Sequence, residues 1–138
     1  MSDFVLDASV ALAWVLDRPE PIYALQVRKE LARGKRGLVP ALWFLEVANG
    51  LAMAERRGDL TSVEVDIALK QIESTAASSL NTDTGLTALR DALTGARTWQ
   101  LTAYDASYLD LARREGLPLA TLDKSLASAA KKAGVAIL

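Results

Sequence analysis

Neither cysteine nor histidine occurs in this chain of 138 residues. The absence of cysteine excludes disulfide bonds, thiol nucleophiles and thiolate metal ligands, and it fits the cytoplasmic location that we expect. The absence of histidine removes the commonest general base and the commonest zinc ligand. Any metal or acid–base chemistry must therefore come from oxygen ligands, above all from carboxylates.

Long hydrophobic runs are also missing. No apolar run approaches the roughly 18 residues that a membrane span requires, and Met1-Ser2-Asp3 lacks the basic flank of a signal peptide. The net charge is −1 at pH 7, so the charge balance neither requires nor excludes a nucleic-acid partner. The composition, with 51% hydrophobic and 24% charged residues, is that of an ordinary globular protein, and we expect a single domain.

Short apolar strands alternate with helices along the chain. This alternation predicts an α/β fold in which a short parallel sheet of about five strands is flanked by helices on both faces. The predicted strands are residues 3–7, 38–39, 78–80, 117–122 and 135–138. The predicted helices are residues 8–16, 21–33, 40–57, 84–98 and 124–133. A further helix is predicted after its cap Thr61, and another runs from its cap Thr102 to Gly116.

Four acids stand in apolar surroundings, where a carboxylate is costly unless it is paired or bound to metal. Asp7 and Asp123 each end an apolar run at the carboxyl end of a predicted strand, where sites form in parallel α/β sheets. Glu46 lies in the nearly all-apolar segment 41–48, and Asp105 falls on the apolar side of its helix. These positions predict a shared site.

Each acid also has a purely structural interpretation. Asp7 and Asp123 suit the cap of the helix that follows them, a role compatible with a site. Asp105 stands three residues after Thr102, which is the spacing of a capping box, and Glu46 could belong to a solvent-facing stripe. Gly50, four residues after Glu46, is costly within a helix and indicates a close approach by another group.

Clustered carboxylates suit Mg²⁺, or alternatively Mn²⁺, because these ions prefer octahedral oxygen coordination and keep several waters. Such an ion lowers the pKa of a bound water and neutralises phosphate oxygens in the transition state. The substrate class that uses this chemistry most naturally is the phosphodiester.

Four segments, taken in their order along the chain, resemble the PIN-domain family, and specifically the VapC-type toxin ribonucleases of bacterial toxin–antitoxin pairs. They are Val5-Leu6-Asp7-Ala8-Ser9, Glu46-Val47-Ala48-Asn49, residues 101–109 and Leu119-Ala120-Thr121-Leu122-Asp123. The resemblance spans nearly the whole chain and implies one PIN-like nuclease domain over residues 1–138 that cleaves RNA with Mg²⁺. It also implies a small antitoxin partner whose tail enters the acidic groove, and a homodimer; no membrane partner is expected.

The resemblance assigns roles by position. Thr121 and Ser9 resemble polar positions near the metal and its water, and Thr121 is counted among the catalytic residues. Asn49 resembles an asparagine that would orient Glu46 from one turn away. The positions that resemble the catalytic, Mg²⁺-binding acids of the family are Asp7, Glu46, Asp105 and Asp123.

Other features have two interpretations. Residues 28–36 carry five basic side chains and one acid, and we interpret them as a solvated helix end rather than as a grip on RNA phosphates. We interpret Trp14, Trp43 and Trp99 as core or interface residues rather than as base-stacking platforms.

Two further classes of function stay open. A phospho-accepting receiver would have this size and sheet type, but it would need an acid pair after the first strand, where Ala8-Ser9 stands. A non-catalytic interaction domain could use the same scaffold. Among enzymes, the alternative to a toxin is a PIN nuclease that processes RNA outside a toxin–antitoxin pair.

Overall fold

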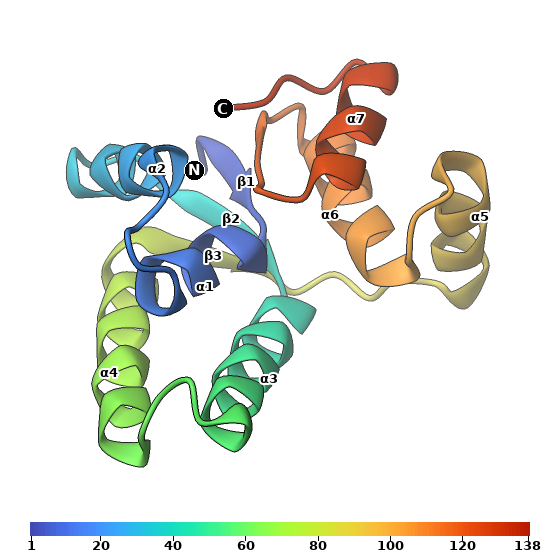
Figure 1. Ribbon diagram of the computed structural model, residues 1–138. Helices are drawn as coiled ribbons and strands as arrows, with labels where there is room; N and C mark the ends of the chain where they lie inside the picture. Colours follow the sequence, from blue (N-terminus) through green and yellow to red (C-terminus); the bar gives the residue numbers. More distant parts are fainter.

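A computed structural model describes residues 1–138 (Figure 1). It contains seven helices and a four-stranded parallel sheet with the strand order β3-β2-β1-β4. The strands are β1 (Phe4–Leu6), β2 (Gly37–Pro40), β3 (Leu80–Asp83) and β4 (Leu119–Ala120). The helices are α1 (Ala8–Leu16), α2 (Ile22–Ala32), α3 (Leu42–Arg57), α4 (Ser62–Ser79), α5 (Leu89–Trp99), α6 (Ala103–Glu115) and α7 (Lys124–Lys132). The predicted α/β class is confirmed.

The sheet is built around β1, whose three side chains are completely buried. A strand that is apolar at consecutive positions is buried on both faces, as expected for a parallel sheet covered by helices. In Figure 1, α5, α6 and α7 lie on one side of the strands, and α1, α2 and α4 lie on the other. Helix α6 packs on β1, β2 and β4, whereas α1 packs against α2 and α3. None of the helices combines the length and hydropathy that a membrane crossing requires.

Local signals in the sequence account for several helix ends. Thr61 and Glu64 form the complete capping box that their spacing predicts, with both reciprocal hydrogen bonds present. Gly58 and Gly116 adopt left-handed φ angles of +80° and +65° directly after α3 and α6, a conformation that glycine takes without a steric penalty. These two glycines end their helices where predicted.

The prediction was wrong at four places. The final strand is reduced to an isolated parallel bridge between Leu119 and Ile137, so the sheet has four strands rather than five. The helix predicted from residue 84 begins only at Leu89, and it buries none of its side chains. Helix α4 continues to Ser79, which moves β3 to residues 80–83. The predicted helix over 40–57 begins two residues late, because Pro40 ends β2.

Candidate active site

The site forms where β1 and β4 end. These neighbouring strands run parallel, with Leu6 in register with Ala120, so the residues that follow them emerge at the same edge of the sheet. The backbone N–H of Asp7 donates to the carbonyl of Ala120 at 2.9 Å and continues the pairing by one step. The register therefore brings Asp7 beside Thr121, although the two residues are far apart in the sequence.

Asp7 is a buried acid with 4% of its surface exposed. It occupies the cap position of α1, but its side chain makes no capping hydrogen bond. Instead, its Oδ2 accepts hydrogen bonds from Ser9 Oγ at 2.6 Å and from Thr121 Oγ1 at 2.7 Å. The structural interpretation of Asp7 as a helix cap therefore does not explain why its carboxylate is buried here.

Backbone N–H groups determine which way the hydroxyl protons of Ser9 and Thr121 point. Ser9 Oγ accepts from the N–H of Leu122 at 3.0 Å, and Thr121 Oγ1 accepts from the N–H of Asp123 at 3.0 Å. A hydroxyl has a single proton, and in both residues it is the proton that bonds to Asp7. Both donors bond Oδ2, so Oδ1 of Asp7 receives no side-chain hydrogen bond and is the oxygen that a further ligand can use.

Glu46, on α3, is half-buried and is held by a residue that was not among the predicted site residues. The hydroxyl of Tyr108, on α6, donates to Glu46 Oε1 at 2.6 Å. A signal for this partner was available, because a buried tyrosine hydroxyl usually needs an acceptor and Tyr108 lies one helical turn after Asp105. No hydrogen bond joins Asn49 to Glu46, and Asn49 is exposed.

The other two acids, Asp105 and Asp123, lie at the N-termini of helices α6 and α7. Asp123 caps α7 by accepting from the N–H of Leu126 at 2.9 Å through Oδ1, so its predicted capping role is confirmed for one of its two oxygens. At α6, Thr102 accepts from the N–H of Asp105 at 3.1 Å, but the reciprocal bond seen at Thr61 and Glu64 is not formed. Asp105 is therefore not a full capping-box partner.

The acids act on one another electrostatically. Burial is the largest cause that raises the pKa of Asp7, of Glu46 and of Asp105 above the ordinary value of each. Neighbouring negative charge adds to each shift: Asp123 raises the pKa of Asp7, and both Asp7 and Asp105 raise the pKa of Glu46. The pKa of Asp105 is raised in the same way by Asp123 and Asp7. The structure thus brings the four predicted acids into one region.

The four carboxylates do not surround a single point. No group of three acids is arranged so that it could hold one metal ion, which differs from the compact site that the sequence predicted. Three of the four acids instead have one oxygen bonded to a protein donor. The chemistry of the donor set, which is entirely carboxylate and hydroxyl oxygen, still fits a hard divalent cation.

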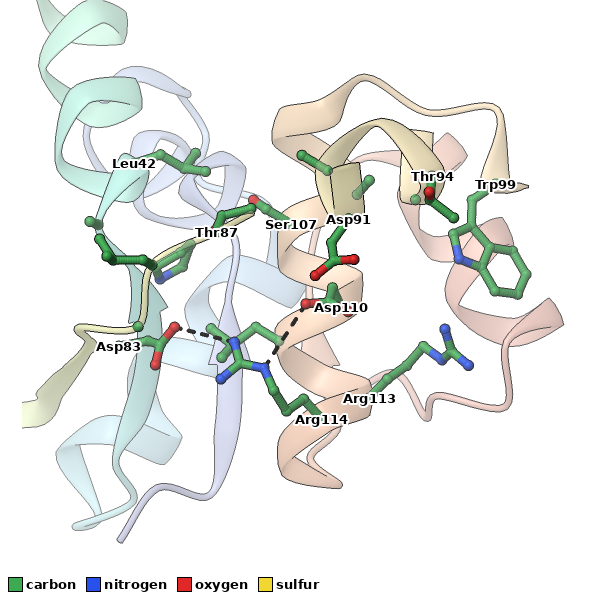
Figure 2. Close-up of a pocket in the computed structure, with 18 of the residues that line it drawn as sticks. Leu42, Asp83, Thr87, Asp91, Thr94, Trp99, Ser107, Asp110, Arg113 and Arg114 are labelled. Carbon is green, nitrogen blue, oxygen red and sulfur yellow. Dashed lines mark hydrogen bonds and ion pairs between the residues drawn. The ribbon is translucent and has the colours of Figure 1, made fainter. Parts of the chain in front are cut away.

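A cavity of about 490 Å³ lies beyond these acids, between the segment after β3 and helices α5 and α6 (Figure 2). None of the four acids lines it. Among the residues that line it, Arg114 forms ion pairs with Asp83 at 3.3 Å and with Asp110 at 4.0 Å. Leu42, one helical turn before Glu46, and Ser107, next to Tyr108, are part of its lining, so the cavity adjoins both helices that carry the site.

The basic segment 28–36 lies at the opposite end of the strands from the site, because it leads into the start of β2. Two of its cations form short ion pairs: Arg28 pairs with Glu20 at 2.6 Å, and Lys35 pairs with Glu30 at 2.6 Å. Arg36 donates to the carbonyl of Ser78 at 2.9 Å and so ties β2 to the end of α4. This arrangement supports the interpretation as a helix end and separates the segment from Asp7.

The tryptophans also follow their structural interpretation. Trp14 and Trp43 are buried in the core, and Trp14 Nε1 donates to the carbonyl of Ala24 at 2.8 Å. Trp99 is half-buried, with the guanidinium carbon of Arg113 5.5 Å from its ring centroid. One face of the Trp99 indole is therefore already covered by a cation.

Comparisons with known proteins give the family and the fold of the chain. The model of the PIN domain matches residues 4–132, which include all four acids. The fold is also similar to the crystal structure of PAE2754 from Pyrobaculum aerophilum, with a TM-score of 0.70 and 25% sequence identity, over 93% of this chain and 79% of that one. No curated protein matches the sequence. The chain belongs to the PIN domain family, whose members are generally nucleases and typically use divalent metals.

Proposed function

We propose that residues 1–138 form a Mg²⁺-dependent endoribonuclease of the VapC type, the toxin of a type II toxin–antitoxin pair. The observation that carries this proposal is the convergence of Asp7, Glu46 and Asp105 with Asp123, in which the pKa of each of the first three is raised by burial and by charge on the others. Acids held at such a cost to the folded state indicate a function that needs their charge. The order of the matching segments favours RNA as the substrate.

In this proposal, the charge of the cation draws the four carboxylates together around it, and Thr121 and Ser9 fix the orientation of Asp7. Because both hydroxyls bond Oδ2, the Asp7 carboxylate is presented in one orientation with Oδ1 free of side-chain donors. When bound, Mg²⁺ (or Mn²⁺) supplies an activated water and neutralises phosphate charge. The excess of negative charge also means that an RNA phosphate is repelled from the site until a cation is present.

Partners are part of the proposal. A small antitoxin is expected to bind the acidic groove and block it, and a second copy of this chain is expected to pair with the first. Support for pairing comes from α5, which buries none of its side chains and leaves Leu89 86% and Leu93 47% exposed. The alternative, a PIN nuclease in RNA processing, predicts no cognate antitoxin. An adjacent small gene for a DNA-binding protein that co-purifies with this chain would separate the two.

The experiment compares the wild type with two variants of the same helix. Asp105→Asn removes an acid of the site, whereas Asp110→Asn removes an exposed acid five residues later. Each protein is incubated with a mixed RNA pool, with Mg²⁺ or with EDTA, and the new RNA ends are mapped. We expect specific ends only with Mg²⁺, for the wild type and Asp110→Asn but not for Asp105→Asn. Equal cleavage by the wild type and Asp105→Asn would contradict the assignment. Lack of cleavage by the wild type across the whole pool would favour a non-catalytic interaction domain.

A further inference from the structure

The two walls of the candidate site are joined by one side-chain hydrogen bond. Glu46 lies on α3, which packs on α1 and α4, while Tyr108 lies on α6, which packs on the sheet. The bond from the Tyr108 hydroxyl to Glu46 Oε1, at 2.6 Å, is the only side-chain hydrogen bond that links α3 to α6. This contact therefore ties Glu46 to the helix whose first turn carries Asp105.

The two partners differ in freedom. Tyr108 is completely buried in the core, so the position of its hydroxyl is fixed by packing around the ring. Glu46 is only half-buried and has a longer, more flexible chain of rotatable bonds. In such a pair the rigid member determines where the flexible one lies, so Tyr108 sets the place of the Glu46 carboxylate.

The bond also decides which oxygen is free. Tyr108 has one hydroxyl proton and gives it to Oε1, which leaves Oε2 of Glu46 without a side-chain donor. Asp7 shows the same arrangement, since Ser9 and Thr121 both donate to Oδ2 and leave Oδ1. In both acids one oxygen is held by a hydroxyl and the other is left for a ligand.

We propose that Tyr108 is a positioning residue that holds Glu46 through Oε1 and so presents Oε2 to the cation that Asp7 also binds. This inference rests on the proposed metal-dependent function and adds a residue that neither the acidic pattern nor the family match assigns. Removing a group that orients a metal ligand typically weakens metal binding by about 10- to 100-fold. We expect a loss of that size in Tyr108→Phe, which keeps the ring in the core and removes only the hydroxyl.

The test measures Mn²⁺ binding to the purified chain by titration calorimetry without RNA, so that it does not depend on activity. The matched control is Tyr104→Phe, because Tyr104 lies one turn earlier on α6, is 65% exposed and makes no side-chain hydrogen bond. We expect wild-type affinity for Tyr104→Phe and a 10- to 100-fold weaker affinity for Tyr108→Phe. Tyr108→Met, which adapts to the same space without a hydroxyl, replaces the phenylalanine variant if that variant does not fold.

A double-mutant comparison shows whether Tyr108 acts through Glu46. In a Glu46→Gln background, Tyr108→Phe should change the Mn²⁺ affinity by less than about twofold, because the carboxylate that it positions is already lost. An unchanged affinity in the single variant Tyr108→Phe overturns the inference and leaves the proposed function standing. A full loss that persists in the Glu46→Gln background also overturns it. Absence of Mn²⁺ binding in the wild type overturns the metal site itself, and the role of Tyr108 with it.

Discussion

The hydroxyl of Thr121 donates a 2.7 Å hydrogen bond to Oδ2 of Asp7, across a separation of 114 positions in the chain. The bond joins the ends of two neighbouring parallel strands, and the same hydroxyl accepts from the N–H of Asp123 at 3.0 Å. Thr121 thus connects the buried acid to the loop that carries the fourth acid. Four predictions follow from this network, from its charge and from the packing that supports it.

Replacing Thr121 by valine keeps the shape of the side chain and removes the hydroxyl. Thr121 is buried, so the change leaves the Asp7 carboxylate with one donor fewer and the N–H of Asp123 without its acceptor. We expect the free energy of unfolding to fall by about 1–3 kcal/mol. Urea denaturation measures this loss, and Thr82→Val, an exposed threonine in β3 with no side-chain hydrogen bond, should stay within about 0.5 kcal/mol of the wild type. Equal effects of the two variants would contradict a special role for Thr121.

The pH dependence of stability has an unusual sign at this site. The folded-state pKa values of Asp7, Glu46 and Asp105 are raised, so between the ordinary and the raised value the folded protein binds more protons than the unfolded chain. The contribution of these groups is fully present below the ordinary values and is lost as pH rises through the raised ones. Without divalent cations, they should lower the free energy of unfolding as pH increases from about 4 toward neutrality.

The variant Asp7→Asn isolates the contribution of one acid to the pH dependence of the free energy of unfolding. The pKa values of Glu30 and Glu64 are lowered, so these groups act in the opposite sense in both proteins and cancel from the difference. We expect the variant to gain stability relative to the wild type as pH rises, because the amide needs no charge to be buried. Urea denaturation at a series of pH values, in EDTA, measures the difference. A difference that does not change with pH would show that Asp7 titrates normally.

Addition of Mg²⁺ should raise the melting temperature of the wild type, since a ligand that binds only the folded state stabilises it by about 2.7 kcal/mol at a hundred times its Kd. The cation also relieves repulsion among acids that have no ion-pair partner. The effect should grow with pH, because the carboxylates must lose their protons to bind metal. Thermal melts with Mg²⁺, against NaCl of equal ionic strength, test this expectation. An equal shift in Asp7→Asn would place the bound ion elsewhere.

The sequence predicted which acids come together, but it did not predict the hydrogen-bond partner that holds Glu46. Asp7 and Asp123 could be placed because each ends an apolar run, and parallel strands bring their carboxyl ends to one edge. Tyr108 was missed because hydrophobic periodicity counts a tyrosine as core, and its hydroxyl finds Glu46 only through tertiary packing. Pattern alone also could not show that three of the carboxylates would bond to protein donors.

Helix α5 shows a different limit of the sequence pattern. The helix predicted over residues 84–98 has leucines at positions 86, 89 and 93, which is helical spacing, but residues 84–88 are irregular and these leucines are exposed. Periodicity reports which residues share a face and not what covers that face. The prediction of a final strand was wrong for a related reason. An apolar chain end fits the pattern of a buried strand whether it forms a full strand or a single bridge to Leu119.

Gly50 links packing to the site, as its unfavourable position within α3 suggested. A Cβ at this residue would lie 2.5 Å from Leu12 Cδ2 and 2.7 Å from Leu12 Cδ1, so glycine is what allows α1 to approach α3 this closely. Because Asp7 precedes α1 and Glu46 lies one turn before Gly50, the same contact sets the spacing of two acids. Gly50→Ala gains about 0.5–1 kcal/mol in helix propensity. Overpacking against Leu12 costs about 1–3 kcal/mol, and we expect a net loss of stability.

Leu12→Ala provides the control, because it removes the atoms that the new Cβ would meet. In that background, the clash of Gly50→Ala disappears and only the gain in helix propensity remains, so the second substitution should be neutral or stabilising. The free energies of unfolding of the wild type, both single variants and the double variant, measured in urea, give the coupling directly. Additive effects would mean that Leu12 moves aside without cost. The spacing of Asp7 and Glu46 would then have to be maintained by other contacts, of which the Tyr108 hydrogen bond is the first to examine.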